Sequence, residues 1–368
     1  MPEKTRVLVY TTAYKPFIGG SEIALEENIR QLPDIFFDVF TPRYRRDLSQ
    51  KECSGNFCVH RVGLGFFPAD KYPFPALGFL ASLGALKKTD VIHVYQASFG
   101  GLAGLAAKIF FPKKKLIATL QEGKELNKQN IFIRIARNMI LKKSDVITVI
   151  SSYLKDYATA INKKAKIVLI PNGVDLNRFR PSISGDKHTI ITVSRLVRKN
   201  GLGDLIKAMK KVVQKIPEAK LLIVGSGEEE KEEEKKLRGL VKEWNLDRSV
   251  EFCGEVRHED TSEYLSKTSI FVRPSLSEGL GSAFLEAMAS GLAVIGTPVG
   301  GIPDFLKDGE TGLFCKPGNS EDIAEKIIKL MEDDDLRNSL AKNSRKLVEE
   351  KYDWEKISKE FEKLYARI

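Results

Sequence analysis

Residues 270–289 read IFVRPSLSEGLGSAFLEAMA. The apolar run Ile270–Val272 is typical of a buried strand. The glycine- and serine-rich turn that follows leads into a helical pattern that starts near Ser282. A strand that ends in a glycine-rich turn before a helix is the repeating unit of doubly wound parallel sheets. This stretch therefore predicts an α/β fold.

The same alternation of short apolar runs and helical patterns recurs along the chain. With 368 residues, the chain is too long for one ordinary core. We therefore predict two Rossmann-like, doubly wound parallel-sheet domains that face a central cleft. The expected strands are Arg6–Thr11, Phe37–Phe40, Val91–Tyr95, Leu116–Leu120, Val146–Ile150 and Ile167–Ile170 in the first half, and Thr189–Val193, Leu221–Val224, Val250–Phe252, Ile270–Val272 and Ala293–Gly296 in the second.

A break between the two sets of strands is expected after residue 170. The segment Pro171–Asp175 reads PNGVD, and the proline, serine and glycine of Pro181–Gly185 follow it. Such residues are typical of linkers and turns. We therefore expect an N-terminal domain of residues 1–175 and a C-terminal domain of residues 185–350.

The formal net charge of +10 is concentrated in the first half of the chain, where residues 1–184 hold 28 basic and 15 acidic side chains. This excess can attract a phosphate-bearing partner, or it can consist of solvated lysines on helix ends and loops. No aromatic stacking motif or basic helix accompanies it, so we expect no specific nucleic-acid partner.

The four cysteines show neither C-x-x-C pairing nor histidine partners at zinc-finger spacing, so we expect reduced, mostly buried thiols and no metal site. They are Cys53, Cys58, Cys253 and Cys315. The N-terminus leads directly into the short run Val7–Tyr10, without the features of a signal peptide, and we expect a cytoplasmic protein.

Two apolar segments bear on the acceptor. Tyr72–Pro75 and the run Leu77–Leu86, beside the basic surface, suggest a lipid-linked acceptor and peripheral contact with an anionic membrane at its inner face. An ordinary loop and a buried helix explain them equally well.

Two turns carry candidate chemistry besides the one quoted first. Gly19 and Gly20 permit close backbone approach, and Ser21 can cap the next helix, so this turn either binds an anion or is merely a turn. Arg195 and Lys199 follow a strand end, where two cations can neutralise a diphosphate or form a surface ion pair.

The quoted stretch holds two carboxylates. Gly279, Leu280, Gly281 and Ser282 form a bent loop whose amides can cradle a phosphate at a helix N-terminus. Glu278 before the loop and Glu286 in the helix are suitable acceptors for sugar hydroxyls. The alternative, a helix-start glutamate and an exposed one, is weakened because Glu286 lies in the apolar stretch Ala283–Ala289.

At these residues the chain resembles the family-4 retaining glycosyltransferases of the GT-B fold. The resemblance spans nearly the whole chain and also includes Gly300–Pro303 and Asp308–Gly312. It implies that the N-terminal domain binds the acceptor and the C-terminal domain a nucleotide-sugar, and that the last helix, residues 352–368, packs back on the N-terminal domain.

The resemblance also assigns roles to single residues. It implies that Arg195 and Lys199 bind the donor diphosphate, Glu278 the transferred sugar and Glu286 the ribose. The backbone around Glu255 and Val256 would meet the base.

Two positions depart from the family pattern. Asn200 stands where members commonly have lysine before the glycine, one residue after Lys199. Gln121 stands at the position of a histidine that contacts the transferred sugar in such enzymes. We expect Gln121 to retain a hydrogen bond to that sugar without titrating near neutral pH.

These observations predict a metal-independent retaining hexosyltransferase that uses a UDP- or GDP-linked sugar, needs no cofactor and acts on a glycan or lipid-linked acceptor. Asp333–Asp335 is interpreted as a helix start and not as a metal motif. The alternatives are a nucleotide-sugar epimerase and a non-catalytic basic binding protein. A nicotinamide oxidoreductase is disfavoured, because no G-x-G-x-x-G follows the first strand.

Overall fold

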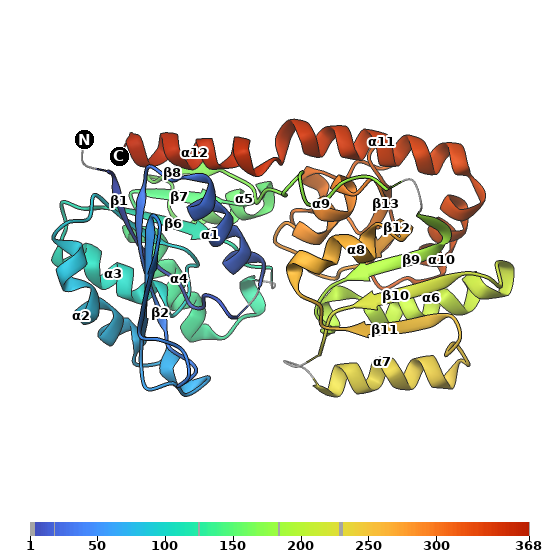
Figure 1. Ribbon diagram of the computed structural model, residues 1–368, viewed down its shortest axis with the longest axis horizontal. Helices are drawn as coiled ribbons and strands as arrows, with labels where there is room; N and C mark the ends of the chain where they lie inside the picture. Colours follow the sequence, from blue (N-terminus) through green and yellow to red (C-terminus); the bar gives the residue numbers. More distant parts are fainter. Residues whose placement is uncertain (1–3, 18, 124–125, 183–184, 228–230, 368) are drawn as a thin grey trace. The chain divides into compact units, whose positions relative to one another are not determined.

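The computed structural model describes residues 4–17, 19–123, 126–182, 185–227 and 231–367. The chain forms two compact units, which Figure 1 shows with both chain termini in the first. Unit 1 consists of Met1–Asn172 and Trp354–Ile368, and unit 2 of Gly173–Asp353. The chain thus passes from unit 1 to unit 2 within the PNGVD segment and returns just before its last helix.

Unit 1 is built on a sheet that has eight strands among the described residues, in the order β3-β4-β2-β1-β5-β6-β7-β8. All neighbours are parallel except the β3–β4 hairpin. The strands are β1 Arg6–Tyr10, β2 Phe36–Pro42, β3 Lys51–Ser54, β4 Phe57–Val62, β5 Val91–Val94, β6 Lys115–Leu120, β7 Val146–Val149 and β8 Lys166–Leu169. The helices are α1 Gly20–Gln31, α2 Phe74–Leu86, α3 Gly101–Phe110, α4 Ile131–Lys143, α5 Ser152–Ile161 and α12 Trp354–Ala366.

The last helix, α12, is part of the core of unit 1. Its apolar residues Trp354, Ile357 and Phe361 share one buried cluster with α1 and the central strands. The Tyr365 hydroxyl lies 2.8 Å from Nδ1 of His93 on β5, and both side chains are buried. Burial of each large apolar side chain contributes about 1.5–3 kcal/mol, so the end of the chain stabilises the unit in which the chain begins.

The β3–β4 hairpin corrects the sequence analysis. Cys53 and Cys58 lie opposite each other in its register and form a disulfide, so they are not reduced, buried thiols. Cys253 and Cys315 are free cysteines, and Cys315 is buried. The pairing was missed because it depends on a hairpin whose first strand is wholly exposed and lacks an apolar pattern.

Unit 2 has a parallel sheet of six strands among the described residues, in the order β11-β10-β9-β12-β13-β14. The strands are β9 Asp186–Val193, β10 Lys220–Val224, β11 Val250–Gly254, β12 Thr268–Arg273, β13 Ala293–Gly296 and β14 Leu313–Phe314. The helices are α6 Leu202–Lys215, α7 Lys231–Glu243, α8 Thr261–Leu265, α9 Ser282–Ala289, α10 Ser320–Glu332 and α11 Asp334–Lys351.

The segment before β9 packs into unit 2. Val174 donates a backbone hydrogen bond to Tyr352, and Phe179 is fully buried with its carbonyl bound by Arg345. The expected linker Pro181–Gly185 lies partly outside the described residues, because Ile183 and Ser184 are not described.

Two further expectations concern the helices. Asp333 caps the N-terminus of α11 by accepting a hydrogen bond from the Leu336 amide, as expected of a helix start. No helix in the described part of the chain is long and apolar enough to span a membrane.

Candidate functional site

The strand order of unit 2 creates a switch point. The order of strands along the chain reverses at β9, which has β10 on one side and β12 on the other. In doubly wound sheets, ligands bind at the carboxyl ends of the strands beside such a reversal. The two loops that leave this point are residues 194–201 after β9 and residues 274–281 after β12. These loops hold Arg195, Lys199 and Glu278.

Glycines with left-handed backbone conformations hold these loops together. Gly201 has φ +72°, and a Cβ there would lie 1.9 Å from the Pro274 carbonyl oxygen. Gly300, in the loop after β13, has φ +55°, and its Cβ would lie 1.7 Å from the Glu278 carbonyl oxygen. Only glycine permits such approach. Loops from three neighbouring strands therefore meet directly at this edge.

The two predicted diphosphate ligands lie in the loop after β9. Arg195 is exposed, and Lys199 is half-buried in the 3-10 turn Arg198–Asn200. Asn200 is buried, and its side-chain amide donates to the Arg195 carbonyl at 2.8 Å. The Lys199 carbonyl accepts from the Leu276 amide at 2.7 Å. This turn is therefore fixed to the loop after β12.

Glu278 is buried and has two partners. One carboxylate oxygen accepts from the Gly279 amide at 3.0 Å, and the other pairs with the guanidinium of Arg273. Arg273 is the last residue of β12, and burial together with the nearby charge of Arg195 lowers its pKa to about 10. Sequence analysis missed Arg273. The available signal was an arginine that ends an otherwise apolar strand.

Glu286 is held by a histidine that sequence analysis also missed. Nε2 of His258 lies 2.8 Å from a Glu286 carboxylate oxygen. Nδ1 of His258 lies 3.3 Å from a guanidinium nitrogen of Arg178, which can only donate. Nδ1 therefore accepts, Nε2 carries the hydrogen, and His258 donates to Glu286. The negative charge of Glu286 also acts on Arg273, where it offsets part of the lowering of the Arg273 pKa.

The remaining predicted residues of unit 2 lie around the same edge. Helix α9 begins at Ser282 behind Gly281, which has φ +98°. Gly279 and Leu280 are buried in the preceding loop, and Val256 follows β11. The exposed carboxylate of Glu255 accepts from the Ser226 hydroxyl at 3.0 Å, which joins the loops after β10 and β11.

In unit 1, the Gly19–Gly20 turn starts α1 differently from the expectation. The N-cap is Gly19, which has no side chain for capping, and Ser21 lies inside the helix. The Ser21 hydroxyl instead donates to Glu22 at 2.9 Å and accepts from Gln96. The proposed cap was therefore wrong by two residues. Ile18, in the same turn, lies outside the described residues.

Gln121 lies after β6 and forms a reciprocal amide pair with Asn172. Each side chain donates to the oxygen of the other at 3.0 Å. Beside it, burial raises the pKa of Glu122, whose carboxylate lies 3.7 Å from the Arg137 guanidinium. The Gln121 side-chain amide thus has two protein partners, Asn172 and the hydroxyl of Tyr95.

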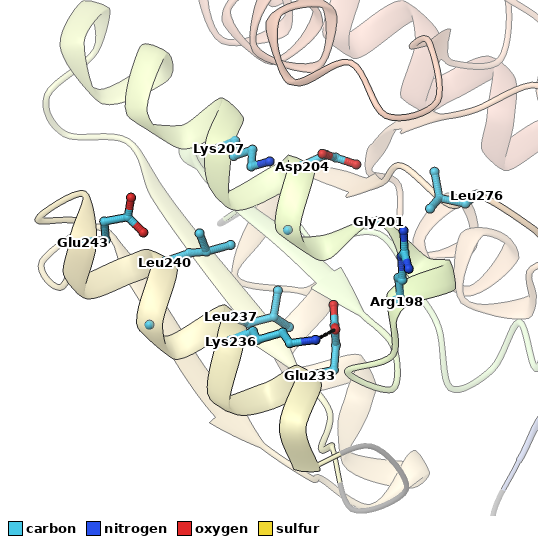
Figure 2. A pocket seen from close by; sticks show the side chains of 12 residues that line it. Arg198, Gly201, Asp204, Lys207, Glu233, Lys236, Leu237, Leu240, Glu243 and Leu276 are labelled. Atoms are coloured by element: carbon cyan, nitrogen blue, oxygen red, sulfur yellow. Dashed lines mark ion pairs between the residues drawn. The ribbon is translucent and has the colours of Figure 1, made fainter.

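A groove of about 610 Å³ lies between α6 and α7, and Figure 2 shows its lining. Arg198, Gly201 and Leu276 connect it to the two site loops, while the charged side chains Glu233 and Lys236 form an ion pair on its wall. It has no predicted site residue in its described lining. The groove is therefore a neighbour of the candidate site and not the site itself.

Comparison with known proteins identifies the family and the fold class. Residues 18–178 match the model of Glycosyltransferase Family 4, and residues 174–347 match that of Glycosyl transferases group 1. Together with two parallel-sheet domains, these matches define the class as glycosyltransferases of the GT-B fold.

Similar proteins cover almost the whole chain. The N-acetyl-alpha-D-glucosaminyl L-malate synthase of Bacillus anthracis is 26% identical over 96% of this chain and 95% of its own. Sucrose-phosphate synthase of Thermosynechococcus elongatus superposes with a TM-score of 0.88 at 25% identity over 99% of both chains. The structure of Anabaena HepE in complex with UDP and glucose superposes with a TM-score of 0.82 at 18% identity, over 99% of this chain and 100% of its own. The two proteins share the fold. The protein belongs to the family-4, group 1 glycosyltransferases.

Proposed function

We propose that the protein transfers a hexose-type sugar from a UDP- or GDP-linked donor to a glycan or lipid-linked acceptor, with retention of configuration and without a divalent metal. The observation that carries this proposal is the edge of unit 2 where Arg195, Lys199 and Glu278 lie on loops joined by glycines, with Glu286 on helix α9 behind them. The names of similar proteins support both bases, because one is GDP-mannose-dependent and another was solved with UDP.

In this proposal, unit 2 stabilises the leaving diphosphate. Arg195, Lys199 and the N-terminal amides of α9 supply positive charge where negative charge develops. That charge can replace a divalent metal. The bond between the sugar C1 and the diphosphate oxygen breaks, the bond to the acceptor oxygen forms on the same face, and the leaving phosphate takes the acceptor proton. Catalysis then depends on positioning and electrostatics.

The other assignments are part of the same proposal. Glu278 binds hydroxyls of the transferred sugar, Glu286 the ribose, and the backbone at Glu255 and Val256 the base. Gln121 contacts the transferred sugar through its side-chain amide. The Gly19–Gly20 turn borders the donor.

The acceptor proposal includes peripheral contact of a cytoplasmic protein with an anionic membrane. It is supported by exposed apolar side chains on unit 1, including Leu80 on α2, which is 57% exposed, and Phe110 on α3, which is 69% exposed. The rings of Phe79 and Phe110 stack at 5.1 Å, so these helices expose apolar residues side by side. Flotation with anionic and neutral vesicles tests it, and equal recovery with both would refute it.

The test of the donor proposal is a thermal-shift and hydrolysis screen with UDP, GDP and their sugar conjugates, in EDTA and in Mn²⁺. We expect one nucleotide to stabilise the protein and its conjugate to be hydrolysed slowly, equally well in both. Arg195→Met should lower the affinity for that nucleotide about 10- to 100-fold, as expected for loss of a charge-assisted hydrogen bond. Lys211→Met, which removes an exposed cation paired with Glu321 in the same unit, is the control. Binding that requires Mn²⁺, or an Arg195 variant equal to the control, would refute the assignment.

A further inference from the structure

Arg273 is a buried cation at the end of β12 that contacts Glu278 of the candidate site. Its exposure is 8%, and its Nε donates to the Ser275 hydroxyl at 3.2 Å. A terminal nitrogen donates to Glu278, and the guanidinium lies over the Phe284 ring, 5.6 Å from its centroid. The planar fork of arginine thus makes two contacts in one plane, which a lysine cannot reproduce.

Another buried arginine of unit 2 serves for comparison. Arg337 is 7% exposed, donates to the Leu330 carbonyl at 2.7 Å and pairs with Asp334 at 2.8 Å. It thereby joins the end of α10 to the start of α11 and has a structural role. Arg273 has nearly the same burial but contacts residues of the loop after β12 instead.

We infer that Arg273 is a positioning residue that fixes the Glu278 carboxylate, in its ionised form, for recognition of the transferred sugar. This inference rests on the proposed function. Among the described residues, one oxygen of Glu278 accepts a hydrogen bond from Gly279 and the other accepts one from Arg273. A carboxylate oxygen can accept two, so each keeps one position for a sugar hydroxyl. A buried carboxylate without a cation would take up a proton and lose that capacity.

The charges around the pair support a fixed arrangement. Burial and, from the loop after β9, the charge of Arg195 lower the pKa of Arg273, whereas Glu286 on α9, itself bound by His258, raises it. The result, about 10, leaves Arg273 protonated at neutral pH. The cation beside Glu278 is therefore permanent under working conditions.

The experiment compares Arg273→Met, Arg273→Lys, Glu278→Gln and the double variant Arg273→Met/Glu278→Gln with wild type, and uses Arg337→Met as the control. Affinity for the free nucleoside diphosphate is measured separately from hydrolysis of its sugar conjugate. We expect Arg273→Met to bind the free nucleotide within about twofold of wild type and to hydrolyse the conjugate about 10- to 100-fold more slowly.

The pH profile and the double variant identify the mechanism. In Arg273→Met the acid limb of hydrolysis should move to higher pH, because Glu278 keeps its proton. Adding Glu278→Gln should cost little more activity and should restore stability, since the glutamine amide is neutral without having to take up a proton. Arg273→Lys keeps the positive charge but not both contacts of the guanidinium. The acid limb of its pH profile should therefore lie at the wild-type pH, while its rate of conjugate hydrolysis stays about tenfold below wild type. This variant also decides the matter if Arg273→Met does not fold.

The outcomes separate the two proposals. A wild-type protein that neither binds nor hydrolyses any nucleotide-sugar would refute the proposed function. An active wild type whose Arg273→Lys and Arg273→Met variants hydrolyse the conjugate at the wild-type rate would refute this inference alone. An Arg273→Met variant whose affinity for the free nucleotide and whose hydrolysis of the conjugate fall by the same factor would also refute it, because a purely structural role predicts that result.

Discussion

Substitution of Gly300 by alanine tests how the loop after β13 holds Glu278. Gly300 has φ +55°, and an added Cβ would lie 1.7 Å from the carbonyl oxygen of Glu278, where contacts under 3.0 Å are essentially never seen. The two backbones must therefore separate by at least 1.3 Å. That carbonyl belongs to the residue assigned to the sugar, so the displacement acts on the carboxylate directly.

The structure contains a matched control for the conformational part of this effect. Gly309 has φ +74°, and a Cβ there would meet nothing within 4 Å. Gly309→Ala should therefore cost only the left-handed strain, about 1–2 kcal/mol in the free energy of unfolding. Gly300→Ala adds the overpacking, about 1–3 kcal/mol, for a total of about 2–5 kcal/mol.

Chemical denaturation of both variants gives the stability difference, and hydrolysis of the nucleotide-sugar gives the functional one. We expect Gly300→Ala to lose at least about tenfold in kcat/KM, which corresponds to 1.4 kcal/mol, and Gly309→Ala to keep the wild-type rate. Two alanine variants of equal stability and equal activity would show that the Gly300 contact does not position Glu278.

Two further predictions concern other side chains. Glu286→Gln removes the charge of the carboxylate to which His258 is hydrogen-bonded. We expect about tenfold weaker binding of the nucleoside diphosphate, and a smaller loss of affinity when the ribose hydroxyls of the nucleotide are removed, both measured by calorimetry. An unchanged loss of affinity would contradict the ribose assignment. His93 is fully buried, and desolvation lowers its pKa to about 3. Since the unfolded imidazole titrates near about 6.5, unfolded chains bind more protons between these values, and stability falls as the pH drops through this window, by up to about 1.4 kcal/mol per unit. His93→Asn should flatten that part of the denaturation profile relative to wild type, and a profile with the same slope would contradict the assignment.

The sequence predicted the strands that lie in the cores of both sheets. The strands Val91–Val94 and Ala293–Gly296 are buried throughout, because both faces of a parallel sheet are covered. It did not predict β3, whose residues Lys51–Ser54 are all exposed, its partly buried neighbour β4, Phe57–Val62, or β14, which has two residues. Exposed, partly buried or very short strands lack the continuous apolar pattern on which such predictions depend.

The candidate site shows a similar division. Residues next to a strand end and a glycine, such as Glu278, could be recognised locally, because their position in the chain also determines their edge of the sheet. His258 could not be matched to Glu286, and the Gln121–Asn172 pair could not be foreseen, because these contacts join residues 28 and 51 positions apart. Local sequence thus indicates which side chains reach the site but not which protein groups already bind them.

The turn before Gly201 explains why this chain has asparagine at position 200, where family members commonly have lysine, and has its lysine at position 199. Asn200 is 3% exposed, and its amide binds the Arg195 carbonyl inside the turn. A lysine at that position would have to bury its ammonium group or break this contact, and either costs free energy. In a 3-10 turn, neighbouring side chains are about 120° apart around the axis, so the half-buried position 199 can take the cation instead. Because the Lys199 carbonyl is also bound by Leu276, the turn keeps that cation next to the loop that carries Glu278.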